Sequence, residues 1–256
     1  MPKLQIHQFP CLADNFGVLI RDAETGVAAA IDAPDAKAVA AALAAQGWRL
    51  THILTTHHHG DHTGGNLALK SQTNCTIFGP RAEAAKVPGL DTGVGEGDTF
   101  ILGAHEVRVL DTPGHTAGHI TYWIPAASVA FVGDTLFSIG CGRVIEGTPE
   151  QMWHSLVKLR DLPDETEFYC GHEYTAANIK FARTIEPNNT ALAARDAQAR
   201  QQIAKNEPTI PVTIGAEKMA NPFLRADVSE VASGIGMAGK PAAQVFAEIR
   251  VRKNKF

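Results

Sequence analysis

Four of the chain's eleven histidines fall within six residues directly after a short apolar strand pattern, and this segment limits the possible folds most. The segment runs from Thr56 to His62 (THHHGDH) and continues the strand pattern that begins at His52. Imidazole nitrogens and a carboxylate are the ligands of a borderline divalent ion such as zinc. A tag-like histidine run would not lie between a strand and a helix or carry an aspartate in register. The spacing therefore predicts a metal site formed by His57, His59, Asp61 and His62.

Three more strand patterns end in residues of the ligand type. They end at His115 after a Pro-Gly turn, at Asp134 after an apolar strand, and at His172 after a glycine. A single histidine at a strand end is more often structural, but four such strand ends together predict one shared site. Seven ligands exceed the four of a closed zinc site and suit two ions about 3.5–4 Å apart. We expect Asp134 as the bridge, with His57, His59 and His115 on one ion and Asp61, His62 and His172 on the other.

The remaining histidines lack ligand spacing. His58 lies between two ligands and is expected to point away from them, and His119 is expected to have a supporting role. Asp32 ends its own strand pattern, and it is expected either to hydrogen-bond a ligand histidine and fix its tautomer or to mark the start of the next helix. His7, His52, His105 and His154 have no ligand spacing.

The composition excludes several classes of protein. A net charge of −4 over 256 residues gives no general basic field for nucleic acid. No apolar run approaches the roughly 20 residues of a membrane-spanning helix. The four cysteines are scattered without a CxxC pair, which indicates reduced, mostly buried thiols. We expect a cytoplasmic protein that binds neither nucleic acid nor membrane, although an import sequence removed beforehand would leave the same pattern.

The order of strand and helix patterns indicates the fold class. Strand patterns separated by turn residues continue to about Cys170, and helix patterns are few and come late in each unit of strands. This arrangement favours stacked mixed sheets covered by helices, an α/β (α+β) fold. After His172 no strand pattern of any strength is visible, so we predict two domains, 1–172 and 173–256, the second helical. Helices are predicted at 35–47, 64–71, 149–160, 191–205 and from Pro241 toward Phe256, and strands at 17–21, 27–32, 52–56, 106–111, 119–124 and 128–133.

These motifs resemble the metallo-β-lactamase superfamily and, within it, the glyoxalase II (hydroxyacylglutathione hydrolase) family. THHHGDHTGG, DTPGHTAGHI, FVGDTLF and YCGHEYT mark the superfamily. The resemblance to the glyoxalase II family rests on residues 14–16 (DNF), 140–143 (GCGR), 171–175 (GHEYT) and 221–225 (NPFLR), and on the basic C-terminal helix. The resemblance covers essentially the whole chain.

The resemblance implies a four-layer αβ/βα sandwich followed by an α-helical, glutathione-binding domain. It also implies a binuclear centre holding two divalent ions per subunit, with zinc as the first expectation and iron or manganese as alternatives. Glutathione would be held by Arg143, Tyr174, Arg250 and Lys253. The chain departs from the family at Ile145, where some members carry a tyrosine that contacts glutathione.

The activity implied is hydrolysis of S-D-lactoylglutathione to glutathione and D-lactate by a monomeric enzyme. Asp61 and Asp134 are the expected catalytic carboxylates. One alternative is a persulfide dioxygenase of the same fold with a single iron, which oxygen consumption with glutathione persulfide would distinguish. A metal-dependent nuclease or phosphodiesterase shares the first motif, but it would normally bring a basic surface or a further domain.

Overall fold

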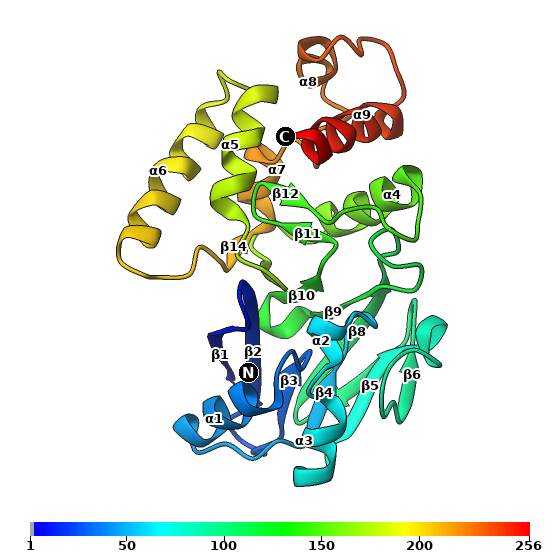
Figure 1. Ribbon diagram of the computed structural model, residues 1–256, viewed down its shortest axis with the longest axis vertical. Helices are drawn as coiled ribbons and strands as arrows, with labels where there is room; N and C mark the ends of the chain where they lie inside the picture. The colour runs from blue at the N-terminus through cyan, green and yellow to red at the C-terminus, as the bar shows by residue number, and fades with distance from the viewer. Residues whose placement is uncertain (1–2) are drawn as a thin grey trace. The chain divides into compact units, whose positions relative to one another are not determined.

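The computed structural model describes residues 3–256 (Figure 1). The chain forms two compact units, each described here by itself. The N-terminal unit comprises the chain up to Asp111 together with Thr116–Gly133, and the C-terminal unit comprises Thr112–His115 and Asp134–Phe256. The predicted boundary after His172 stays a prediction.

The N-terminal unit begins with a six-stranded mixed sheet in the order β1-β2-β3-β4-β5-β6. The first three strands pair antiparallel, and β3 to β6 pair parallel. Parallel neighbours need crossover connections, which explains the helices inserted after β3 and β4. The strands are β1 (Leu4–Cys11), β2 (Asn15–Asp22), β3 (Ala28–Ile31), β4 (His52–Leu54), β5 (Thr76–Pro80) and β6 (Thr92–Val94).

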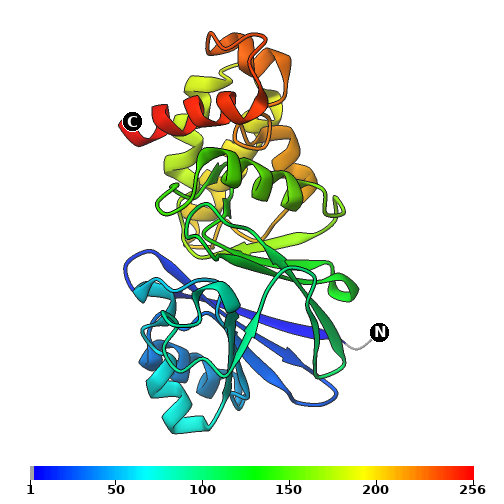
Figure 2. The ribbon, with the colours of Figure 1, turned by 90° about the vertical axis from the view of Figure 1, so that its right-hand side faces the viewer.

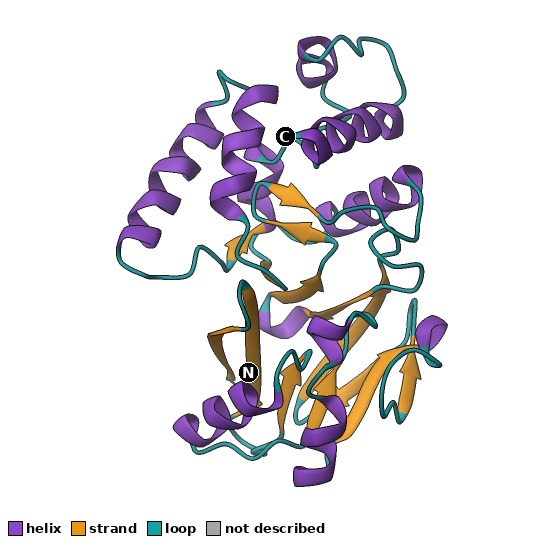
Figure 3. Ribbon diagram, viewed as in Figure 1, coloured by secondary structure: helices purple, strands orange, loops and turns teal. Residues whose placement is uncertain are grey.

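Helices α1 (Ala36–Gln46) and α3 (Asn66–Thr73) pack against this sheet (Figure 3). Asp35 caps α1 by accepting a hydrogen bond from Ala38 N at 2.8 Å, and Gly47 ends it at φ +65. The predicted helix over 35–47 is therefore confirmed. The one-turn helix α2 (Gly60–Thr63) precedes α3. The core beneath the helices contains Leu19, Ala30, Val39, Leu43, Ile53, Leu69 and Ile77.

A second, antiparallel run in this unit packs face to face on the first sheet. It has the order β10-β9-β8-β7. The rings of Phe78 and Phe100 stack with centroids 4.6 Å apart, and Tyr122 Oη donates to Thr55 O at 2.9 Å. The first contact joins this run to β5, and the second joins it to the residue that follows β4. The elements are η1 (Arg81–Glu83), β7 (Thr99–Leu102), β8 (His105–Asp111), β9 (Ile120–Ile124), η2 (Pro125–Ala127) and β10 (Val129–Gly133).

The C-terminal unit is mainly helical. It contains β11 (Leu136–Phe137), β12 (Gly140–Cys141), α4 (Pro149–Arg160), β13 (Glu167–Cys170), α5 (Thr175–Ile185), α6 (Thr190–Ala204), β14 (Val212–Thr213), α7 (Ile214–Ala220), α8 (Ser229–Gly234) and α9 (Ala242–Lys255). The predicted helices at 149–160, 191–205 and after Pro241 are confirmed as α4, α6 and α9. One strand, β14, was not expected after His172. It has only two residues, too few to produce an alternating pattern, and pairs antiparallel with β13.

Helix α9 lies beside α4 in both views of the chain (Figures 1 and 2). Phe246 of α9 lies with its ring centroid 6.2 Å from Trp153 of α4 and 6.1 Å from Phe223. All four cysteines are buried and free, as predicted. Among the helices of residues 3–256, none combines the length and the apolar character needed to cross a membrane.

Candidate metal centre

The loop after β4 gathers its four predicted ligands within the N-terminal unit. His57 Nε2 lies 3.2 Å from His59 Nδ1, and the rings of His57 and His62 have centroids 4.1 Å apart. His62 Nε2 lies 3.7 Å from Asp61 Oδ2. Two nitrogens that bind one zinc tetrahedrally at about 2.0–2.1 Å lie about 3.3 Å apart. The spacing of His57 and His59 therefore fits a shared ion.

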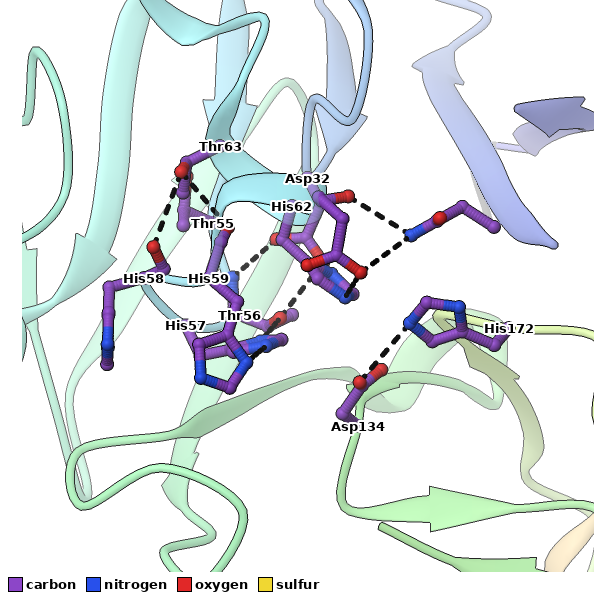
Figure 4. Close-up of polar contacts among 12 residues, drawn as sticks. Asp32, Thr55, Thr56, His57, His58, His59, His62, Thr63, Asp134 and His172 are labelled. Atoms are coloured by element: carbon purple, nitrogen blue, oxygen red, sulfur yellow. Dashed lines mark hydrogen bonds and ion pairs between the residues drawn. The ribbon is translucent and has the colours of Figure 1, made fainter. Parts of the chain in front are cut away.

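Asp32 fixes the tautomers of two of these histidines (Figure 4). Its Oδ2 accepts from His62 Nδ1 at 2.8 Å and from Thr56 Oγ1 at 2.9 Å. Because the Thr56 hydroxyl proton goes to Asp32, Thr56 Oγ1 accepts from His57 Nδ1, 3.0 Å away. Both rings are thereby protonated on Nδ1 and keep the Nε2 lone pair for a cation. Of the two roles predicted for Asp32, the hydrogen bond to a predicted ligand histidine is confirmed, and the cap of α1 is Asp35 instead.

Glu83 holds the middle of the same loop. The carboxylate is buried and accepts from His58 N at 2.9 Å and from Gly118 N at 2.8 Å. Its Oε2 also pairs with His58 Nδ1 at 2.8 Å, so His58 is engaged away from the ligands, as expected. A Cβ on residue 118 would meet Glu83 Cγ at 2.6 Å, so this approach requires glycine.

Asn15, at the start of β2, supports Asp61. Its amide Nδ2 donates to the Asp61 carbonyl at 3.1 Å and to Asp61 Oδ2 at 3.3 Å. Asn15 is buried although the Asp61 side chain is 43% exposed. A buried donor thus restrains one oxygen of a carboxylate that is otherwise open to solvent. The roles of Glu83 and Asn15 could not be predicted from the sequence, because neither residue has ligand spacing.

The C-terminal unit brings its three predicted ligands together. Asp134 Oδ2 lies 3.4 Å from His115 Nε2 and 3.3 Å from His172 Nε2, and all three side chains are buried. Figure 4 shows the contact between His172 and Asp134. One carboxylate oxygen of Asp134 thus faces two imidazoles, which is compatible with its predicted role as a bridge.

Each histidine of this cluster has a further partner in its own unit. His115 Nδ1 donates to the main-chain carbonyl of Arg143 at 2.9 Å, which leaves Nε2 unprotonated for a cation. The ring of His172 stacks on Tyr174 with centroids 4.9 Å apart and planes 1° from parallel. An added Cβ on Gly142 would collide with the Asp134 carbonyl oxygen, so the turn before Arg143 requires glycine.

The four predicted substrate contacts differ in exposure. Arg143 and Tyr174 are exposed. Arg250 is buried, donates from Nη1 to the carbonyl of Cys141 at 3.0 Å and lies over the ring of Phe223. Lys253 is partly buried and donates to Ala177 O at 2.9 Å. Burial, and secondly the charge of Arg250, lower the pKa of Lys253 to about 8.

The donor chemistry of both clusters suits divalent cations. The ring nitrogens of His57 lie within 4.8 Å of those of His59 and His62, and the Asp61 carboxylate is equally close to His62. Three of the histidines have the tautomer that a cation needs, and each cluster adds a carboxylate. The residues therefore fit divalent metal ions.

Known proteins match both parts of the chain. The profile of the Metallo-beta-lactamase superfamily matches residues 22–172, and that of the Hydroxyacylglutathione hydrolase C-terminus matches residues 173–256. The hydroxyacylglutathione hydrolase of Rhodopseudomonas palustris (strain BisB5) is 56% identical over 245 residues, 96% of each chain. That of Maricaulis maris (strain MCS10) is 49% identical over 256 residues, 100% of each chain.

Two solved structures share the fold. ETHE1 from Myxococcus xanthus superposes with a TM-score of 0.69 at 28% identity, covering 96% of this chain and 90% of that one. TTHA1623 in a di-iron-bound form has a TM-score of 0.61 at 22% identity, covering 85% of this chain and 99% of that one. The chain therefore belongs to the metallo-beta-lactamase superfamily and, within it, to the hydroxyacylglutathione hydrolase family.

Proposed function

We propose that the protein is a binuclear-metal thioester hydrolase that converts S-(2-hydroxyacyl)glutathione, S-D-lactoylglutathione above all, to glutathione and a 2-hydroxy acid. With D-lactate as the product, this is the second step of methylglyoxal detoxification. The observation that carries the proposal is the identity of 56% to a hydroxyacylglutathione hydrolase over 96% of both chains. We further propose a cytoplasmic, monomeric enzyme that binds neither nucleic acid nor membrane.

The seven predicted ligands would hold two divalent ions. One ion would be held by His57, His59 and His115, the other by Asp61, His62 and His172, with Asp134 shared between them. Zinc is the first expectation, and iron or manganese are alternatives; the di-iron form of TTHA1623 keeps iron among them. When bound, such a pair supplies a water of lowered pKa and a Lewis acid that polarises the thioester carbonyl.

The chain's own residues would orient the attacking water, and its buried cysteines argue against covalent catalysis by a thiol. Asp61, restrained by Asn15 through one oxygen, would direct the attacking water with the other. Burial raises the pKa of the Cys141 thiol to about 11, and burial also raises that of Cys170 well above its ordinary value. Both thiols are protonated at neutral pH, so neither is an activated nucleophile. Direct attack of water on the thioester remains.

Glutathione carries two carboxylates, and four side chains are proposed to hold it. These side chains are Arg143, Tyr174, Arg250 and Lys253. The side chains of Arg143 and Tyr174 are exposed to solvent and therefore accessible to a substrate. Arg250 and Lys253 lie three residues apart on α9 and therefore share one face of the helix.

The pKa of Lys253 predicts a pH dependence of substrate binding. The ammonium is present below a pH of about 8 and is lost above it, since the pKa in the folded protein is lower than that of free lysine. We expect KM for S-D-lactoylglutathione to rise several-fold as the pH increases through about 8. Steady-state kinetics of the wild type and of Lys253→Met would test this. The variant should have a raised KM that does not change over the same range, and an unchanging wild-type KM would exclude an ionic role for Lys253.

Ile145, which is 52% exposed, stands where some relatives carry a tyrosine. We expect Ile145→Tyr to lower KM by about twofold to tenfold, the effect of one hydrogen bond worth about 0.5–1.5 kcal/mol. Ile145→Phe is the matched control, because it adds the ring without the hydroxyl. Equal KM values for the two variants would show that no such hydrogen bond forms.

The decisive experiment is hydrolysis of S-D-lactoylglutathione by the purified protein, with metal content measured on the same sample. We expect turnover with two ions bound per chain. No turnover in a sample that holds both ions would overturn the proposal, as would full activity after the metal is removed. Oxygen consumption with glutathione persulfide, measured in parallel, would indicate the dioxygenase instead.

A further inference from the structure

The hairpin of β11 and β12 has an unusual turn. Its paired residues are Leu136 with Cys141 and Phe137 with Gly140, which leaves Ser138 and Ile139 as a two-residue loop. Ile139 is fully buried and has a φ of +57, a left-handed conformation that β-branched residues rarely adopt. Glycine or asparagine would be usual there. Contacts from outside the hairpin must therefore stabilise the turn.

Glu217 of α7 supplies those contacts. Its Oε2 accepts from Ile139 N at 2.8 Å, and its Oε1 accepts from Ser138 Oγ at 3.0 Å. Asn221 Nδ2 donates to Glu217 Oε2 at 2.8 Å and to Gly140 O at 3.0 Å. The carboxylate thus receives three hydrogen bonds, two of them from the turn itself.

A buried cation completes the network. Arg195 of α6 donates from Nε and Nη2 to Ser138 Oγ at 3.2 and 3.1 Å, and from Nη2 to Thr209 O at 2.6 Å. The side chains of Glu217 and Arg195 are 1% and 6% exposed. Burial raises the pKa of Glu217 to about 7, because desolvation opposes the charged form, whereas the three donors and the charge of Arg195 favour it. The hydrogen bonds of Glu217 and Arg195 both reach the turn residue Ser138, and Glu217 also reaches Ile139, so the network holds the shape of the hairpin.

The hairpin continues directly into the residues proposed to hold glutathione. Arg250 donates to the carbonyl of Cys141, the last residue of β12, at 3.0 Å, and Arg143 follows two residues later. Displacing the turn would therefore move the acceptor that fixes Arg250 and the chain that carries Arg143. Glu217 itself hydrogen-bonds Ser138, Ile139 and Asn221, so its effect on either arginine would be indirect.

We propose that Glu217 is a positioning residue for glutathione recognition, acting through the turn at Ser138 and Ile139 on the two arginines that hold the glutathione carboxylates. This inference rests on the proposed function. Glu217 would determine how strongly the enzyme distinguishes a glutathione thioester from a thioester without carboxylates. It would not take part in bond cleavage.

The test compares two substrates in one variant. Glu217→Gln keeps the volume of the side chain but gives up one acceptor and the charge. We expect kcat/KM for S-D-lactoylglutathione to fall about tenfold through KM, the size of one lost charge-assisted hydrogen bond. Turnover of S-D-lactoyl-N-acetylcysteamine, which lacks both carboxylates, should stay at the wild-type level, as should the metal content. Glu207→Gln, on an exposed loop of the same unit, is the control and should leave kcat/KM unchanged for both substrates.

A purely structural role predicts a different result. If both substrates lost activity equally, or if only the unfolding temperature changed, the positioning role would be wrong. Should Glu217→Gln not fold, the same comparison of the two substrates is made with Ser138→Ala. This variant removes the hydroxyl that joins Glu217 to Arg195 and leaves both charges in place. The dissociation constant of S-hexylglutathione, a thioether that cannot be hydrolysed, separates this inference from the proposed function. A variant that binds it more weakly supports the inference even if the wild type hydrolyses no thioester.

Discussion

Replacing Asp134 by alanine should reduce kcat/KM for S-D-lactoylglutathione by at least about a thousandfold, or about 4 kcal/mol of transition-state stabilisation. The reason is geometric, because one oxygen of this buried carboxylate lies 3.4 Å from His115 Nε2 and 3.3 Å from His172 Nε2. Without it, two imidazoles would approach a pair of cations with no negative charge between them. Metal content per chain, measured by elemental analysis, should fall together with the activity.

Asp161→Ala is a suitable control, since Asp161 is exposed at the end of α4 and should leave both quantities unchanged. Asp134→Asn refines the result, because it keeps the shape and one oxygen but loses the charge. A variant without the carboxylate that still held two ions and turned over near the wild-type rate would show that Asp134 is not a bridge.

Asp32→Asn should weaken metal binding by about tenfold to a hundredfold, the usual effect of losing a carboxylate that orients a ligand histidine. Asp32 accepts from Thr56 N, Thr56 Oγ1 and His62 Nδ1, and it reaches His57 through the threonine hydroxyl. An amide has one acceptor oxygen in place of two, so one buried donor would lose its partner. Asparagine tolerates the left-handed φ of +57 at this position, so the backbone should keep its shape.

Metal affinity would be measured by competition with a chromogenic chelator, and thermal unfolding would be followed on the same samples. Asp35→Asn is the matched control three residues further along the chain, since asparagine caps a helix as well as aspartate does. Unchanged chelator competition in Asp32→Asn would mean that the histidine tautomers do not depend on this carboxylate.

The residues of both clusters could be predicted from the sequence because each residue lies in a short, locally coded segment. A strand followed by a glycine-bearing turn determines where His57, His62 or His172 points, and the strand patterns carry that information within a few residues. The helix over 35–47 was predicted for the same reason, since its cap and its final glycine are local signals. A hydrogen bond from Asp32 to a predicted ligand histidine was one of two alternatives, and it could be foreseen because Asp32 ends a strand beside the histidine-rich loop.

The supporting residues could not be predicted because their partners are far away in the sequence. Glu83 accepts from His58, 25 residues earlier, and Asn15 donates to Asp61, 46 residues later. Glu217 lies 78 residues from Ile139 and looks in the sequence like any surface glutamate of a short helix. Only the tertiary fold brings such a side chain to its donors. The division into domains at Glu173 remains a prediction of the sequence.

Two of the proposed ligand histidines are oriented by acceptors of different kinds, and this difference determines which substitutions can disturb them. His62 depends on the side chain of Asp32, so a single substitution can remove its acceptor. His115 depends on the backbone oxygen of Arg143, which every amino acid possesses. The side chain at position 143 can therefore be replaced by another without loss of the hydrogen bond that orients His115. Under the proposed function, substitutions at position 143 would change the preference among thioesters and leave the orientation of His115 unchanged.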